Sequence, residues 1–413
     1  MNTTFRNYLL VSFAASTALH GLGFTVPNEN YRQLCGTTYY SDTCNLTSSY
    51  RLSNYMRISY LGGHPQLPFL NIPYDKALYD NKLSDPNKGM VDIQGLIGGF
   101  TTAKIHNQGI LGKNLNGNLS ISVENVILQI TNLKNITGII KDTGFKGAIQ
   151  LQKNTGNIGG IDVRGRSGLT TITNLGTIGV ITTNDRGQIK SLSNSKFIGT
   201  LTNTQQGTII DDITNIGTIR DFNNQGKIEN SLINFNSIGN LDNSGTMKRL
   251  SNFRTLVALK NTGNVGTIVS SGTINSLSNT ETIGTLANAG NLANATNTGT
   301  ITSLSNTRNL NNFNNTTSGV ITNQVSNTGN IGNFTNAGKL SNGFNNQSNA
   351  TVGNFTNSGN AGNFTNAGKI TTATNTGSLA TLTNSGSLAN LNNTKNIANL
   401  SNTGNLTSAK NTG

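Results

Sequence analysis

A nine-residue repeat is the feature of this sequence that most constrains its fold. From residue 243 the chain reads NSGTMKRLS, NFRTLVALK, NTGNVGTIV and SSGTINSLS, and the pattern Asn-x-Gly-x-Ile/Leu-x-x-Leu-x returns near the end as NTGSLATLT and NSGSLANLN. Looser and less evenly spaced units precede this array from Asn174 onward. One unit cannot bury its two apolar residues alone, so stacked units must share a continuous core.

Each unit combines a turn signal with a strand signal. Asn and Gly tolerate left-handed backbone angles, so Asn-x-Gly marks a bend. The Ile, Leu and Thr residues around it favour short strands. Helix is disfavoured because Gly and Asn recur every turn or two. The sequence therefore predicts an all-β chain folded as a parallel β-helix (β-solenoid), with the turn asparagines stacked in side-chain amide ladders.

The charged residues indicate how many units close one coil. The segments LSNFRTL, LSNTETI and LSNTRNL place Arg254, Glu281 and Arg308 in every third unit. Extending this register finds a charge at each corresponding turn, and the longer steps indicate small corner insertions. We predict about three nine-residue units (27–30 residues) per coil and about eleven coils of ~4.8 Å each. One basic corner would then hold Lys196, Lys227, Arg254, Arg308, Lys339, Lys369 and Lys395.

Composition divides the chain near residue 92. All five prolines lie before residue 87, and all nine tyrosines lie before residue 80. We predict an irregular, aromatic N-terminal cap over 22–92 and the solenoid over 93–413, because an open solenoid end exposes strand edges that need covering. The array stops in mid-repeat, which we interpret as truncation of a longer chain.

The segment 1–21 has the character of an export signal. Arg6 precedes the apolar run Tyr8–Ala18, which is too short to span a bilayer. A buried N-terminal helix or strand is the alternative interpretation.

Both cysteines, Cys35 and Cys44, lie in the predicted cap and enclose the short segment CGTTYYSDTC. In an exported protein this pair would be oxidised to one disulfide. A metal pair is the alternative, but it lacks a nearby His or further Cys to complete four ligands. We therefore predict a structural disulfide.

Residues for catalysis and for metal binding are sparse. The histidines are His20, His64 and His106, and neither a Gly-x-Ser-x-Gly nor a Gly-Asp-Ser-Gly segment occurs. Asp211 and Asp212 are the only adjacent acids, and we interpret them as solvated on an inserted corner rather than as a glycosidase pair. Calcium-binding β-rolls need an Asp in each unit, where Asn stands here. We predict no catalytic residue, no cofactor, no metal and no enzymatic activity.

The formal net charge of +13 raises the question of an anionic partner. No aromatic–basic interleaving or nucleic-acid motif occurs, so we predict no nucleic-acid partner. The predicted basic corner has two interpretations. It is either a solubilising edge or a linear strip for anionic glycan or lipopolysaccharide.

The signal-like start, the cap and the long NTGxI and NxGxL arrays resemble the repeat passenger regions of vacuolating-cytotoxin-like autotransporters of Gram-negative bacteria, over roughly residues 93–413. The resemblance implies export to the bacterial cell surface (outer membrane) or secretion. It also implies a C-terminal outer-membrane barrel in the full-length protein, which this chain does not contain. The pore-forming toxin of that family has a long Gly-rich apolar N-terminal stretch, which this sequence lacks.

These observations together predict a non-enzymatic passenger that engages the host cell surface as an adhesin or toxin-like virulence factor. Binding would be multivalent and weak per coil, and insertions near Gln205–Asp212, Thr316–Val325 and Asn345–Val352 would be presented to the partner. The alternatives are a pore-forming vacuolating toxin, a polysaccharide-degrading β-helix enzyme, and ice or surface binding by Thr ladders.

Overall fold

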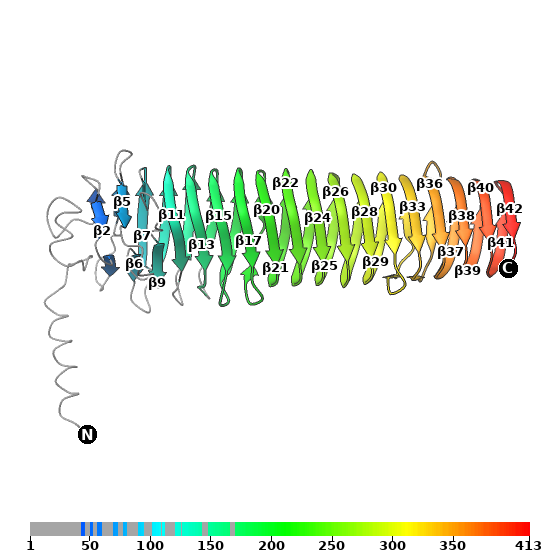
Figure 1. Ribbon diagram of the computed structural model, residues 1–413, viewed down its shortest axis with the longest axis horizontal. Helices are drawn as coiled ribbons and strands as arrows, with labels where there is room; N and C mark the ends of the chain where they lie inside the picture. The colour runs from blue at the N-terminus through cyan, green and yellow to red at the C-terminus, as the bar shows by residue number, and fades with distance from the viewer. Residues whose placement is uncertain are drawn as a thin grey trace, which may run out of the picture. The chain divides into compact units, whose positions relative to one another are not determined.

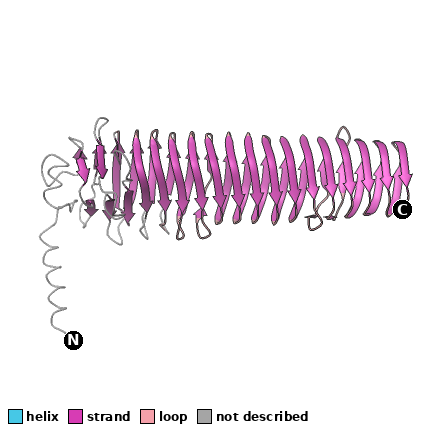
Figure 2. Cartoon of the chain, in the orientation of Figure 1, coloured by secondary structure: helices cyan, strands magenta, loops and turns pink. Residues whose placement is uncertain are grey.

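A computed structural model of the chain shows strands and turns and no helix among the residues it describes (Figures 1 and 2). These residues are 43–45, 50–52, 56–59, 69–72, 77–80, 90–94, 101–108, 110–111, 120–124, 126–142, 148–165 and 170–413. Side chains are described for 104–108, 121, 127–142, 148–165 and 170–413. The predicted signal peptide, Cys35 and the side chain of Cys44 lie outside these ranges, so the disulfide stays a prediction.

The chain alternates between two parallel sheets, A and B, and its strands stack into a β-solenoid of about 15 turns in all. The strand pairings between described residues are parallel, as between the sheet-A strands that align Thr246 with Asn264 and the sheet-B strands that align Thr255 with Thr273. The predicted fold class, an all-β parallel solenoid, is confirmed.

The first unit of the chain contains residues up to Leu192 together with Lys196–Ile198. Its sheet A comprises β1 (Thr43–Asn45), β4 (Phe69–Ile72), β7 (Thr101–Asn107), β10 (Val126–Asn132), β12 (Ala148–Asn154), β14 (Thr170–Asn174) and most of β16 (Gln188–Asn194). Its sheet B comprises β2 (Tyr50–Leu52), β3 (Met56–Ser59), β5 (Ala77–Asp80), β6 (Met90–Gln94), β8 (Ile110–Leu111), β9 (Ser120–Glu124), β11 (Asn135–Asp142), β13 (Asn157–Val163) and β15 (Thr177–Thr183).

Parallel pairing begins inside the segment predicted as an irregular cap. Strand β1 pairs with β4, β2 with β5, and β3 with β6. Each coil here has three strands, because it contributes one strand to sheet A and two short strands to sheet B. From β11 onward one long strand takes the place of the two short ones, since the two halves of β11 pair with β8 and β9.

The second unit contains Ser193–Ser195 and Gly199–Gly413. Its sheet A comprises β18 (Thr208–Ile209), β19 (Ile213–Asn215), β21 (Lys227–Asn234), β23 (Thr246–Asn252), β25 (Asn264–Ser270), β27 (Thr282–Asn288), β29 (Thr300–Asn306), β31 (Val320–Ile321), β32 (Val325–Asn327), β34 (Lys339–Leu340), β35 (Phe344–Asn346), β37 (Asn360–Asn366), β39 (Ser378–Asn384) and β41 (Ile397–Asn402).

Its sheet B comprises most of β17 (Phe197–Asn203), then β20 (Thr218–Asn224), β22 (Ser237–Asn243), β24 (Thr255–Asn261), β26 (Thr273–Asn279), β28 (Asn291–Asn297), β30 (Asn309–Asn315), β33 (Asn330–Asn336), β36 (Thr351–Asn357), β38 (Lys369–Asn375), β40 (Ser387–Asn393) and β42 (Asn405–Asn411).

Two nine-residue units, not three, close one coil of the regular region. Thr255 of β24 pairs with Thr273 of β26, and Thr273 pairs with Asn291 of β28, so each coil repeats after two units. The prediction of three units per coil is therefore wrong, and eleven coils is an undercount. Each unit takes the chain from one sheet to the other, so residues three units apart lie on opposite sheets.

The seven-residue strands from β20 to β40 bury their second, fifth and seventh residues, whereas β41 and β42 are largely exposed. In β27 these are Ile283, Leu286 and Asn288, while the residues between them face outward. Two consecutive outward residues, at positions three and four, show that the strand bends there. The two apolar residues of each unit thus meet those of the other sheet in one core, as the repeat requires.

Phenylalanines fill the core of the second unit where the coils carry insertions. The rings of Phe313 and Phe334 stack with centroids 5.1 Å apart, and Phe334 also meets Phe344 of sheet A edge-on at 5.0 Å. In this region Asn315 bonds Asn336 21 residues further on, whereas Asn297 bonds Asn315 only 18 residues further on.

The predicted insertions are confirmed as longer turns and as interruptions of sheet A. Each of three coils replaces one sheet-A strand by two pieces, β18 with β19, β31 with β32, and β34 with β35. Four-residue turns at 204–207, 316–319 and 347–350 lie in or beside the three predicted segments.

Buried asparagines at the seventh strand position form hydrogen-bonded ladders, as predicted. In sheet B of the second unit Asn261 Nδ2 donates to Asn279 Oδ1 at 2.7 Å, and Asn279 Nδ2 donates to Asn297 Oδ1 at 2.7 Å. The same Nδ2 groups donate to backbone carbonyls, such as those of Glu281 and Thr300 for Asn279. Each amide therefore satisfies buried turn carbonyls as well as its neighbour in the stack.

In the first unit the ladder runs only along sheet A. It joins Asn107, Asn132, Asn154 and Asn174 at 2.7 to 2.8 Å. The equivalent positions of sheet B hold Asp142, Val163 and Thr183 instead.

The regular Asn-x-Gly turns do not use the left-handed backbone angles that this sequence allows, and the described positive φ angles outside glycine belong to the longer turns, at Asp185, Arg186 and Asn349. Among the described glycines only Gly343 has a positive φ, of 85°. The turn glycines have a different role, because a Cβ on Gly290 would collide with the carbonyl of Gly272 in the preceding coil. Gly290 thus permits close approach of the stacked backbones.

Ser270 interrupts the sheet-A ladder and offers a direct test of its energetic weight. Asn252 Nδ2 donates to Ser270 Oγ at 3.1 Å, but the Ser270 hydroxyl donates to the Gly272 carbonyl and the ladder resumes only at Asn288. We expect Ser270→Asn to restore the ladder and raise the free energy of unfolding by about 1 kcal/mol, as one net buried hydrogen bond would. Urea unfolding followed by circular dichroism measures this change.

The matched control is Ser278→Asn, because Ser278 is exposed on sheet B. It should leave the urea midpoint unchanged. Equal effects of the two substitutions would show that the ladder adds nothing specific.

Candidate binding surfaces

The turns define two edges of the solenoid. We call the turns that lead from sheet A to sheet B edge 1, and those that lead from sheet B to sheet A edge 2. Each turn is hydrogen-bonded to the equivalent turn of the preceding coil, as Phe253 N is to Asn234 O and Thr280 N is to Asn261 O. Residues of one edge are therefore stacked along the coils.

The seven basic residues predicted to form one corner lie at both edges. Edge 1 carries Lys196, Arg254, Arg308 and Lys369, whereas edge 2 carries Lys227, Lys339 and Lys395, with Glu281 among them. The prediction of a single basic corner is therefore wrong, because residues spaced three units apart lie alternately at edge 1 and edge 2. Within edge 1, Arg254 and Arg308 are three coils apart, or about 14 Å at the usual strand spacing. Anion binding by these side chains stays a prediction.

The two edges differ in how their cations are engaged. On edge 2, Lys227 Nζ pairs with Glu229 Oε1 at 2.8 Å. No ion pair among the described residues involves Arg254, Arg308 or Lys369 of edge 1. Edge 1 of the second unit is therefore the more strongly basic edge.

The outer sheet faces of the second unit are neutral from Asn261 to Ala409. Every charged residue of that range lies in a turn or at the first position of a strand, namely Glu281, Arg308, Lys339, Lys369 and Lys395. Exposed asparagines of sheet B form a second ladder, in which Asn312 donates to Asn294, Asn333 to Asn312, and Asn354 to Asn333 at 2.7 to 2.9 Å. The face offers amides and hydroxyls repeated at the coil spacing of ~4.8 Å.

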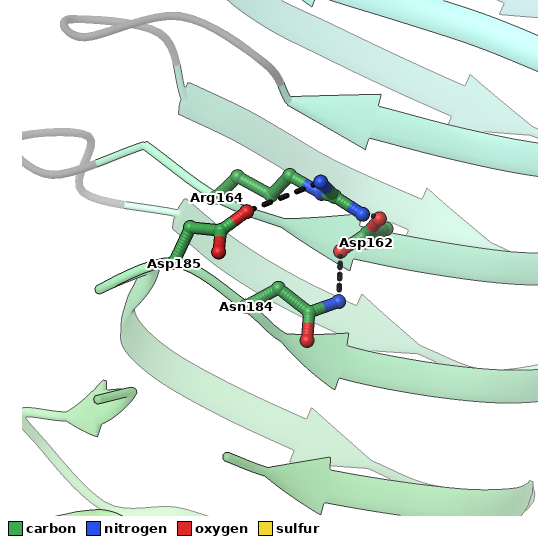
Figure 3. Close-up of polar contacts among 4 residues, drawn as sticks. All are labelled: Asp162, Arg164, Asn184 and Asp185. Carbon is green, nitrogen blue, oxygen red and sulfur yellow. Dashed lines mark hydrogen bonds and ion pairs between the residues drawn. The ribbon is translucent and has the colours of Figure 1, made fainter. Parts of the chain in front are cut away.

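An ion cluster at edge 2 of the first unit links consecutive coils (Figure 3). Arg164 Nε donates to Asp162 Oδ2 at 2.9 Å, and its Nη1 donates to Asp185 Oδ2 at 3.1 Å. Asn184 Nδ2 donates to Asp162 Oδ1 at 2.8 Å. Asp185 and Arg186 have positive φ angles of 50° and 70°, which residues with a Cβ adopt at a steric cost. The cluster thus fixes an irregular turn, and sequence reasoning did not find it.

The adjacent acids Asp211 and Asp212 lie in the interruption between β18 and β19. Asp212 Oδ1 accepts a hydrogen bond from the backbone N of Ser231 at 3.1 Å. This contact ties the interruption to β21 of the next coil.

Asp221 is an acid on the outer face of sheet B with a perturbed pKa. A hydrogen bond from Asn240 Nδ2 at 2.8 Å, then one from Arg220 Nε at 2.8 Å, hold the pKa of Asp221 below its ordinary value. Its contribution to stability is present above the ordinary Asp pKa and is lost as the pH falls through the lowered value.

Exposed apolar side chains occupy one position of edge 1. In the second unit Ile216, Phe235 and Phe253 are the first turn residues of three consecutive coils, and each is about half exposed. The rings of Phe235 and Phe253 stack with centroids 4.9 Å apart and planes 9° apart. In the first unit Leu133 and Leu175 occupy the same turn position. The sequence signal is an apolar residue directly after the turn Asn, where most units have Thr, Ser or Ala.

No group of three or more His, Cys, Asp or Glu side chains that could hold a metal occurs among the described residues. His106, the one described histidine, shares a hydrogen bond of 2.8 Å with Gln108. No helix that could cross a membrane occurs in the described part of the chain.

Comparison of the chain with protein-family models, curated proteins and solved structures gives no match. The fold and the surfaces described above are therefore the basis for any functional proposal.

The ion cluster of the first unit predicts that replacing Arg164 lowers the stability of the protein more than replacing Arg186, which lies in the neighbouring turn of the same edge. Arg164→Gln removes both ion pairs and should lower the free energy of unfolding by about 1 kcal/mol, the upper range for a partly exposed pair. Arg186→Gln removes the same charge from the neighbouring turn, where no ion pair between described residues involves it. Thermal unfolding should show a lower midpoint for Arg164→Gln only. Equal midpoints for the two variants would contradict a structural role for the cluster.

Proposed function

We propose that this chain is a non-enzymatic autotransporter passenger that is displayed on, or released from, the bacterial surface and binds a host cell surface. The observation that carries the proposal is the repetition of one cross-section, which from Asn261 to Ala409 has neutral amide and hydroxyl faces and charges only at the edges. Such a surface offers the same weak contact many times, which favours multivalent attachment over recognition at one pocket.

The composition of the faces supports contact with a hydrated surface. The Asn294–Asn354 ladder of sheet B consists of exposed amides that bond one another and retain further donors and acceptors for a partner. Hydrogen-bonding groups at a regular spacing suit a polymer with its own regular polar groups, such as a glycan.

The basic edges support an anionic ligand, and we propose sulfated or phosphorylated glycans, including lipopolysaccharide, as that ligand. Edge 1 of the second unit presents Arg254, Arg308 and Lys369, none of which forms an ion pair with another described residue. Their wide spacing gives a linear field rather than a compact site, so the contribution of each cation should be small and sensitive to salt.

Binding to immobilised heparin and to lipopolysaccharide tests the basic edges. The triple variant Arg254→Gln, Arg308→Gln and Lys369→Gln should weaken binding about tenfold at low salt, as expected from roughly 0.5 kcal/mol per exposed cation. The edge-2 variant Lys227→Gln, Lys339→Gln and Lys395→Gln removes the same charge and should weaken binding less, because Glu229 and Glu281 already offset that edge. If both triple variants lost the same binding affinity, net charge alone would explain the binding, and edge 1 would have no special role.

Two assays on the full chain test the wider proposal. Fluorescently labelled protein should bind cultured cells saturably, and incubation with acidic polysaccharides should release no new reducing ends. Polysaccharide turnover would establish the enzyme alternative, and dye leakage from liposomes would establish the pore-forming one. Turnover would overturn the non-enzymatic proposal, and leakage would replace surface binding by pore formation as the function.

A further inference from the structure

We propose that edge 1 around Phe235 and Phe253 docks on the surface of an anionic phospholipid bilayer. This inference names a lipid partner for one edge of the second unit and does not depend on the passenger proposal. It starts from the most unusual surface of that unit, a row of exposed apolar side chains at turn positions. We call Ile216, Ile233, Phe235 and Phe253 the apolar edge cluster.

The cluster is continuous across consecutive coils. Ile216, Phe235 and Phe253 are 53%, 46% and 47% exposed, and Phe235 stacks on Phe253. Ile233 lies two residues before Phe235 and also faces outward, half-buried. An apolar row that remains in water after folding marks a contact with something outside the chain.

Cations flank the cluster. Arg254 follows Phe253 in the same turn and is exposed. Arg249 Nε donates to Ser251 Oγ at 3.0 Å. Because Ser251 precedes Phe253 by two residues, this bond holds the Arg249 guanidinium close to the cluster. The edge-1 turns 216–217, 235–236 and 253–254 contain no carboxylate, and on the adjoining strands Asp221 pairs with Arg220 and Glu229 pairs with Lys227. Apolar side chains beside unopposed cations match a bilayer interface with anionic headgroups.

The same pairing occurs in the first unit. There Leu133 is 36% exposed at edge 1 and is followed directly by Lys134, as Phe253 is followed by Arg254. The turn-forming segments NLKN and NFRT thus repeat one combination of an apolar residue and a cation.

The size of the cluster favours a bilayer over a second copy of the chain. Its turns cover three coils, or about 10 Å along the stack. A stable protein interface needs about 800 Å² from each partner, far more than a row one side chain wide supplies. A bilayer needs no complementary surface, because the side chains of a projecting turn row insert between headgroups while flanking cations meet phosphates.

Flotation with vesicles of phosphatidylcholine and phosphatidylserine, mixed in a seven-to-three molar ratio, tests the proposal on the full chain. The unsubstituted protein should float with these vesicles, and Phe235→Thr with Phe253→Thr should reduce its partition at least tenfold. Thr307 and Thr328 occupy the equivalent edge-1 turn position in other coils, so threonine fits the turn. Val257→Thr is the matched control, because Val257 is 43% exposed on the face of sheet B and should be dispensable. All variants keep the apolar run Tyr8–Ala18, so this run cannot account for a difference in flotation between them.

A fluorescence reporter locates the contact. The chain contains no Trp, so Phe253→Trp and Val257→Trp each give a single-tryptophan protein. On adding the vesicles, emission from Trp at 253 should shift to shorter wavelength, while emission from Trp at 257 should not.

Three results would overturn the proposal. They are absence of binding to these vesicles, equal binding by the double threonine variant, and an unshifted reporter at 253. A concentration-dependent dimer in sedimentation that the double variant abolishes would assign the edge to self-association instead. Because none of these readouts involves cells or glycans, failure here leaves the passenger proposal separately testable.

Discussion

The buried asparagine ladder is the interaction on which the rest of the structure depends. An amide such as Asn279 accepts from Asn261, donates to Asn297 and satisfies turn carbonyls, so every coil is aligned with the next at the point where the chain turns. This alignment brings residues two units apart into register. It also explains why a chain with few large apolar residues can form a regular core, since the asparagines at the seventh position are hydrogen-bonded to one another and to turn carbonyls rather than merely buried.

Local chemistry in the sequence was enough to predict the strands, the turns, the shared core and the amide ladders, because each depends on residues within one unit or its equivalent in the next. The number of units per coil could not be read in this way. A nine-residue strand and turn has the same local pattern whether two or three close a coil. The charges at Arg254, Glu281 and Arg308 suggested three, but they recur at alternate edges and return to the same edge only after six units.

This alternation also explains why the surface was only partly predicted. The basic residues were identified individually, but their grouping depended on coil closure. The apolar edge cluster was not predicted, because its grouping also depends on which turns share an edge; Phe235 and Phe253 replace the small or polar residue that usually follows the turn asparagine.

Distances between spin labels test the two-unit coil most directly. In a Cys35→Ser, Cys44→Ser background, nitroxides at Ser276 and Asn294 occupy paired positions of adjacent strands in sheet B. Labels at Ser276 and Ser303, three units apart in the sequence, lie on opposite sheets. A two-unit coil predicts strong dipolar broadening for the first pair, within about 10 Å, and a separation on the order of 20 Å for the second. Broadening in the second pair and not in the first would contradict the fold described here.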